Sequence, residues 1–171
     1  MIMKGQVIGK TMLHGYAGSY SRQPDMIVDT VPLTGNGEVA FGAPVVVGMN
    51  GAAQPWGKDS TADKFYGVAV REVKSSLDYL NQNKGGYHPG EAVSIMKRGC
   101  VNVICQLGTP THGGAVYIRT VADEAKPNAA VGGFEAVEDT GKNEKLSNVQ
   151  WYGTTDANGV AELRILNILN A

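Results

Sequence analysis

Residues 91–106, EAVSIMKRGCVNVICQ, decide the fold. They form the middle of a stretch from Phe65 to Thr120 that carries the clearest strand patterns of the chain. On both sides of Lys97-Arg98-Gly99, apolar residues alternate with polar or small ones, and a period of two over this length is typical of half-buried antiparallel strands. We predict a hairpin that turns at Lys97-Arg98-Gly99, because Gly99 can adopt a positive φ and the two charges stay in water.

Further strand patterns predict that this hairpin belongs to a larger sheet. An isolated hairpin is unstable, so other strands must cover its apolar face. The fold class we predict is all-β: an antiparallel β-barrel or β-sandwich with long loops and an extended N-terminal arm. The additional strands are expected at Met26–Val31, Val45–Val47, Phe65–Val73 and Ala115–Thr120, and in a final hairpin of Val149–Tyr152 and Val160–Leu169.

The chain of 171 residues suits one folded domain, which we place at residues 26–171. Residues 1–25 carry glycines at 5, 9, 15 and 18 and show neither helical nor strand periodicity, so they are expected to form the extended arm. An N-terminal strand docked on its own domain is the alternative. The 23 glycines and 7 prolines favour short strands joined by turns.

Charge and cysteine placement limit the partners and the compartment. The net charge is -1 with both signs interspersed, which argues against nucleic acid or an anionic membrane as a direct ligand. Cys100 and Cys105 are expected on opposite faces of one strand, about 16 Å apart, too far for a disulfide. Reduced thiols fit synthesis in a cytoplasm. No apolar run approaches a membrane span of about 20 residues, and no signal peptide is recognisable.

The residues that could carry catalysis do not form a known pattern. The three histidines, His14, His88 and His112, lack metal-ligand spacing. The paired glycines lie outside any strand-to-helix phosphate loop. The residue types of a catalytic triad are present in Ser94, His88 and Asp78, but the sequence has no nucleophile elbow, so we do not predict a triad. We therefore predict no catalytic, cofactor-binding or metal-binding residue, and hence no enzyme; a small hydrolase or isomerase is the competing idea.

The order of short strand-and-turn motifs resembles the head-decoration, or structural cement, proteins of tailed bacteriophages. The resemblance covers roughly residues 40–170 and rests on these segments: Gly42-Ala43-Pro44-Val45-Val46-Val47, Phe65-Tyr66-Gly67-Val68-Ala69-Val70, Tyr87-His88-Pro89-Gly90-Glu91-Ala92-Val93-Ser94-Ile95, Gly99–Cys105 and Gly113-Gly114-Ala115-Val116-Tyr117. It implies a non-enzymatic virion protein on the capsid exterior, made in the host cytoplasm. Such a protein binds the major capsid protein, bridges neighbouring subunits and forms a homodimer or homotrimer.

Aromatic residues and arginine dominate the energetics of protein interfaces, so they mark the expected partner-binding residues. We assign this role to Tyr16, Tyr20 and Arg22 in the arm and to Trp56 and Tyr79 in two loops. Local packing is the alternative for each of them. Two other functions compete with capsid decoration: a carbohydrate- or receptor-binding module, and a tail or baseplate component of a phage.

Overall fold

A computed structural model describes residues 13–72 and 85–167 of the chain. Within these two ranges the chain forms eleven strands, one 3-10 turn (η1, Ala62–Lys64) and no α-helix, which confirms the all-β prediction. The strands are β1 (Tyr20–Pro32), β2 (Val39–Ala40), β3 (Pro44–Val47), β4 (Ala53–Pro55), β5 (Gly67–Ala69), β6 (Gly86–Tyr87), β7 (Ala92–Leu107), β8 (Ala115–Arg119), β9 (Phe134–Glu135), β10 (Asn143–Trp151) and β11 (Val160–Ile165).

The stretch that was expected to fold back as a hairpin is instead one strand, β7, of 16 residues. The predicted turn at Lys97-Arg98-Gly99 is therefore wrong. The chain does not reverse at Gly99 because the residues on both sides of it pair with other strands: β1 pairs with residues between 92 and 101, and β11 pairs with residues 99–104. Gly99 does have a positive φ of 121°, but a Cβ there would lie 2.7 Å from the carbonyl oxygen of Asp25. Its role is to let β1 approach closely where the register shifts.

Both charges assigned to the turn form ion pairs; Lys97 is largely covered, whereas Arg98 stays exposed. Lys97 Nζ lies 2.9 Å from Asp29 Oδ2, and Arg98 Nε lies 3.1 Å from Asp25 Oδ1. Both carboxylates belong to β1, so these ion pairs link β1 to its neighbour along the sheet.

The second half of β7 closes a five-stranded barrel, here called the C-terminal barrel. Hydrogen-bonded pairs run from β7 to β11, β10, β8 and β9, and back to β7. All of these pairs are antiparallel except β7–β9, which is parallel. The apolar core of this barrel centres on Trp151, whose side chain is fully buried. Its strands confirm the predicted strand at 115–120 and the predicted final hairpin.

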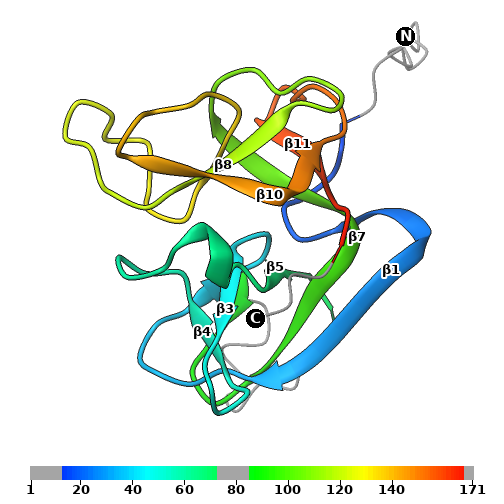
Figure 1. Ribbon diagram of the computed structural model, residues 1–171. Coiled ribbons are helices and arrows are strands. Elements are labelled where there is room, and N and C mark those ends of the chain that lie inside the picture. The colour runs from blue at the N-terminus through cyan, green and yellow to red at the C-terminus, as the bar shows by residue number, and fades with distance from the viewer. Residues whose placement is uncertain (1–12, 73–84, 168–171) are drawn as a thin grey trace, which may run out of the picture.

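The first half of β7 belongs to a second ring, here called the N-terminal barrel. It runs through β1, β7, β5, β3 and β4, and a single bridge between Leu33 and Ala53 joins its two ends. The short pair β2–β6 lies beside it as a separate sheet. Figure 1 shows the two barrels one above the other, with β7 running through both. The core of the N-terminal barrel consists of Leu33, Val39, Val45, Ala53, Ala69, Tyr87, Val93 and Ile95.

The strand predicted from Met26 begins earlier, at Tyr20. Tyr20 and Arg22 pair with Val101 and Cys100 of β7, so part of the segment expected as an arm lies in the sheet. Residues 1–12 fall outside the described ranges, and the division into an arm of residues 1–25 and a domain of residues 26–171 stays a prediction.

Cys100 and Cys105 lie in β7, buried and unpaired. Burial raises the pKa of each thiol to about 11. No helix within the described ranges has the length and apolar character needed to cross a membrane.

Candidate interaction surfaces

The residues considered for catalysis are engaged separately. Ser94 Oγ lies 3.1 Å from Thr30 Oγ1, and His88 Nδ1 lies 2.8 Å from Glu38 Oε1. Asp78 lies outside the described residues. Within 13–72 and 85–167, no three His, Cys, Asp or Glu side chains come close enough together to hold a metal ion. The candidate binding features on the described surface are several hollows.

An apolar groove, here called the waist groove, crosses the junction of the two barrels. It consists of two adjoining hollows of about 290 and 200 Å³ that share Ala40, Ala43, Pro44, Val131 and Gly132. Ala17 and Ile104 line the first hollow, and Trp56 lines the second. The residues that the two hollows share are small or apolar and offer mostly hydrocarbon to a partner, while Glu38 adds a carboxylate to the second hollow.

One predicted partner-binding aromatic, Trp56, lines this groove, and a second, Tyr16, is the sequence neighbour of the lining residue Ala17. Tyr16 precedes Ala17 and is 73% exposed, with the Arg71 guanidinium 5.6 Å from its ring centre. Trp56 is half-buried and packs against the core of the C-terminal barrel, as the local-packing alternative expects. A Cβ on Gly132 would lie 3.1 Å from Trp56 Cδ1, so glycine lets the backbone lie close to the indole ring.

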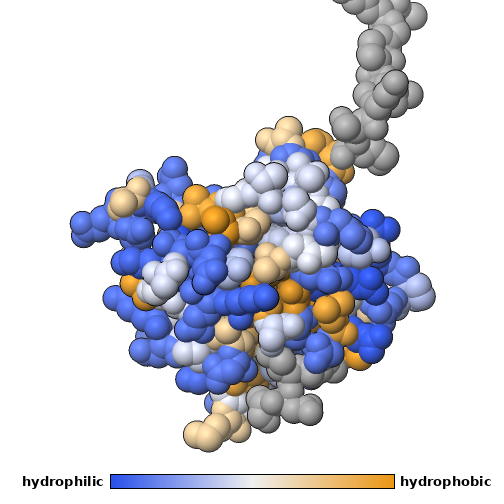
Figure 2. Space-filling model, turned by 45° about the horizontal axis from the view of Figure 1, so that its top comes forward, coloured by the Kyte–Doolittle hydropathy of each residue, from blue (hydrophilic) through white to orange (hydrophobic). Residues whose placement is uncertain are grey.

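Exposed apolar side chains occur in the groove and elsewhere on the described surface. Ile104, in its lining, is 52% exposed, and Leu13, near the start of the described chain, is 59% exposed. On the face shown in Figure 2, apolar side chains form several small groups separated by hydrophilic ones. Such a surface favours several modest contacts over one large hydrophobic interface.

Tyr20 faces inward and contributes to the fold. Its ring packs against the core of the C-terminal barrel, and its hydroxyl donates a hydrogen bond to the Glu72 carboxylate. Burial and that carboxylate raise the pKa of Tyr20 well above its ordinary value. Tyr20 therefore anchors the start of β1, whereas Tyr16 reaches into solvent.

Arg22 lies in a third hollow, which shares no lining residue with the waist groove. Its Nε lies 2.6 Å from Glu162 Oε1 on β11, and the guanidinium carbon lies 4.8 Å from the centre of the Tyr152 ring. The ion pair with Glu162 raises the pKa of Arg22. Tyr79 lies outside the described residues.

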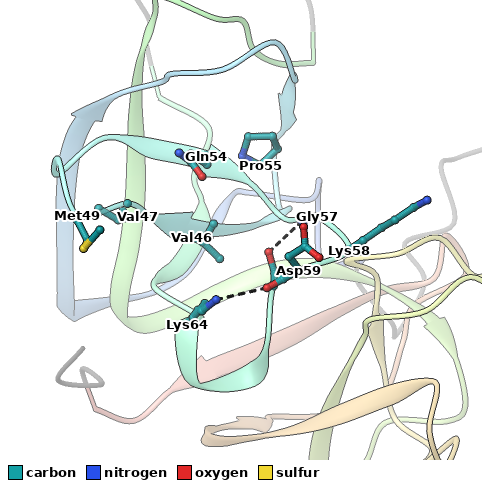
Figure 3. A pocket seen from close by; sticks show the side chains of 11 residues that line it. Val46, Val47, Met49, Gln54, Pro55, Gly57, Lys58, Asp59 and Lys64 are labelled. Atoms are coloured by element: carbon teal, nitrogen blue, oxygen red, sulfur yellow. Dashed lines mark hydrogen bonds between the residues drawn. The ribbon is translucent and has the colours of Figure 1, made fainter.

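The largest of these hollows, about 520 Å³, lies over β3 and β4 and was missed by the sequence analysis. Figure 3 shows Val46 in the middle of the lining, with Met49 and Val47 at the left, Pro55 above, and Lys64 and Asp59 below and to the right. Lys64 Nζ lies 3.5 Å from the Asp59 carbonyl oxygen. The short strand β4 was not among the strands expected from the sequence.

The fold is found in a known phage capsid. One solved chain, from a structure described as "The capsid of Myoviridae Phage XM1", superposes with a TM-score of 0.69 at 15% sequence identity. The alignment covers 99% of this chain and 100% of that chain. At this identity the likeness shows the fold alone. A comparison with curated protein sequences gives no match.

The family is shown by a sequence-based comparison. The family model described as "Structural cement protein (E217 gp24/Pam3 gp6)" matches residues 4–166. The chain belongs to this family of phage structural cement proteins, which confirms the resemblance drawn from the motifs. It is accordingly a structural protein of the phage capsid.

Proposed function

We propose that this protein decorates the outer surface of the assembled capsid, where it binds the major capsid protein and bridges neighbouring subunits. It acts as a non-enzymatic homodimer or homotrimer and reaches the particle from the host cytoplasm. Membership of the structural cement family supports the capsid role. The waist groove, lined by Trp56 and by the exposed Ile104, is the observation that supports a protein-binding surface.

The mechanism we propose is thermodynamic linkage. A protein that binds only the mature lattice stabilises it by RT ln(1 + [L]/Kd) for each site, where L is the free cement protein. If one molecule contacts two neighbouring subunits, the second contact forms at a high effective concentration. Individual contacts can therefore be weak, which fits small apolar hollows rather than one broad patch.

The predicted contact residues differ in how they would contribute to binding: some could contact a partner directly, and others support the surface from within the fold. Tyr16 is exposed enough to contact a partner directly, and Arg22 lines a hollow of its own. Tyr20 acts through the placement of β1, and Trp56 shapes the groove from below. Tyr79 and the rest of the arm of residues 1–25 remain part of the proposal as additional contacts.

A binding experiment with capsids that lack this protein tests the proposal. The Ile104→Asp variant places a carboxylate in the waist groove and should weaken capsid binding at least about tenfold, because the charge would have to be desolvated. Val121→Asp is the matched control, since Val121 is also exposed, at 45%, but does not line the groove. Equal affinities of the two variants would exclude the groove from the interface. Failure of the unmodified protein to bind capsids would exclude decoration itself.

A further inference from the structure

Two arginines that are distant in the sequence stand in one row on the outer face of the sheet. Arg22 of β1 and Arg164 of β11 both pair with Cys100 of β7. Residues paired across neighbouring strands point to the same face, and the strands lie about 4.8 Å apart, so the two arginine Cα atoms are separated by about 10 Å. We call Arg22, Cys100 and Arg164 the arginine row.

The small residue in the middle of this row leaves a gap between two long side chains. A hollow of about 200 Å³ lies there, lined by the arginine row together with Gln23, Pro24, Asp25 and Tyr152. The Tyr152 ring holds both guanidiniums: their carbons lie 4.8 Å (Arg22) and 5.4 Å (Arg164) from its centre. Contact with an aromatic face limits the motion of each guanidinium, so the hollow is ordered before any ligand arrives.

The charges around the hollow do not cancel. Arg22 donates to both carboxylate oxygens of Glu162, at 2.6 and 3.2 Å, and Asp25 pairs with Arg98. For Arg164, no carboxylate of the described chain lies within ion-pair distance. The hollow therefore carries one positive charge without an internal partner, on a planar group that can donate two parallel hydrogen bonds.

We propose that this hollow binds the carboxylate of an aspartate or glutamate side chain presented by the capsid lattice protein. A carboxylate carries one charge and accepts the two hydrogen bonds that a guanidinium donates side by side. A phosphate group fits less well, because the carboxylates of Asp25 and Glu162 already lie beside the arginines and would repel a second negative charge. The proposal rests on the proposed function and specifies the chemistry of one of its contacts.

The first test measures the affinity for capsids that lack this protein. Arg164→Gln should weaken binding at least about tenfold, and Arg164→Lys, which keeps the charge but loses the planar fork, should weaken it less. Lys145→Gln is the matched control, because Lys145 is an exposed cation on β10 that lines none of the hollows and forms no ion pair with another described residue. Thermal unfolding of each variant shows whether the fold is intact.

Equal affinities of Arg164→Gln and Lys145→Gln would overturn the proposal and leave capsid decoration standing. A loss of self-association in Arg164→Gln, with capsid binding unchanged, would assign the hollow to a second copy of this chain and would also overturn the proposal.

If the unmodified protein does not bind capsids, the proposal of capsid decoration is wrong. The carboxylate site is then tested separately, by titration of the protein with a hexaglutamate peptide. Shifts of the Tyr152 ring signals in NMR that are present in Lys145→Gln and absent in Arg164→Gln support a carboxylate site. If the Tyr152 ring signals of the unmodified protein do not shift when the peptide is added at low salt, the carboxylate site is overturned.

Discussion

The C-terminal barrel is closed by strand pairing around its whole circumference, whereas the N-terminal barrel is joined by the single bridge between Leu33 and Ala53. Their interiors differ as well. The C-terminal barrel combines an apolar core around Trp151 with a buried ionic network, whereas the N-terminal barrel has an apolar core that includes Leu33, Ile95 and Tyr87. The buried charges of the C-terminal barrel are tolerated because each has an ionic or hydrogen-bonding partner, while a ring joined by one bridge depends more on its apolar contacts.

The ionic network of the C-terminal barrel lies at one end of the ring. Arg119 and Glu135 have fully buried side chains and lie 2.6 Å apart. Asn143 donates to Glu135, and Asp139 accepts from Arg119 and Lys126 at 2.8 Å each. The network ties β8 and β9 to the start of β10, so it holds the long connections between these strands against the barrel.

The largest expected effect follows from removal of the central arginine. Arg119→Ala leaves Glu135 buried without its partner and should lower the free energy of unfolding by about 3–5 kcal/mol. Urea unfolding measures the loss. Arg98→Ala, which breaks an exposed ion pair with Asp25, is the control and should cost no more than about 1 kcal/mol. Similar losses in both variants would show that the buried network contributes nothing beyond a surface pair.

The second-largest loss of stability is expected from a cavity at Leu33, where a single bridge joins the ends of the N-terminal barrel. Leu33 is 2% exposed, and Leu33→Ala should cost about 2–4 kcal/mol through lost burial and a residual cavity. Leu13→Ala, at a side chain that is 59% exposed, should change stability by less than about 0.5 kcal/mol. Hydrogen exchange locates the effect: in Leu33→Ala, amides of β3 and β4 should lose more protection than those of β10 and β11. Equal losses in both barrels would mean that they unfold as one unit.

The strand that the two barrels share, β7, can be tested at Gly99, where β1 approaches it closely. Gly99→Ala must hold a positive φ and also meets the Asp25 carbonyl, so we expect a loss of about 1–3 kcal/mol. Gly113 has a φ of 76° with open space around its Cβ position, so Gly113→Ala isolates the cost of the backbone conformation. If the two variants lose the same stability in urea, close approach of β1 does not matter at this position.

The smallest effects should appear in the dependence of stability on pH. The Lys126 ammonium and the Arg119 guanidinium lower the pKa of Asp139, and Lys97 lowers the pKa of Asp29 in the other barrel. A carboxyl with a lowered folded-state pKa contributes stability above its ordinary pKa of 3.8, and this contribution is lost as the pH falls through the folded-state value.

Asp139→Asn and Asp29→Asn should therefore each flatten the decline of stability below about pH 4. Thermal unfolding between pH 2 and pH 6 measures this slope in both variants. Glu138→Gln, at an exposed neighbouring carboxyl, is the control and should keep the slope of the unmodified protein. An unchanged slope in either aspartate variant would mean that its ion pair does not persist in solution.

Local patterns predicted part of this fold correctly. A continuous apolar run located β3, and strand patterns located β8 and the hairpin of β10 and β11, because each signal lies within a few consecutive residues. Apolar alternation continues through residues 92–107, and the glycine at 99 was interpreted as a turn although it marks a close contact with β1. A positive φ allows either outcome, and only the pairing partners of the flanking residues distinguish them.

The candidate surfaces were less predictable than the strands. Residue type suggested Tyr16, Arg22 and Trp56, but it did not indicate that Tyr20 would anchor β1. Arg164 was missed because it looked like an ordinary solvated residue of an amphipathic strand. Its significance comes from Arg22, which lies 142 positions away in the sequence and across β7 from it in the sheet, with Cys100 between them.

The sequence by itself determined the all-β class, most of the strands and the resemblance to phage cement proteins, because side-chain alternation and turn residues act over short distances along the chain. The tertiary structure alone decided that β7 serves two barrels and that two arginines flank one cysteine. Both depend on strand register, which is set by long-range packing: a shift of one residue would move every side chain of a strand to the opposite face.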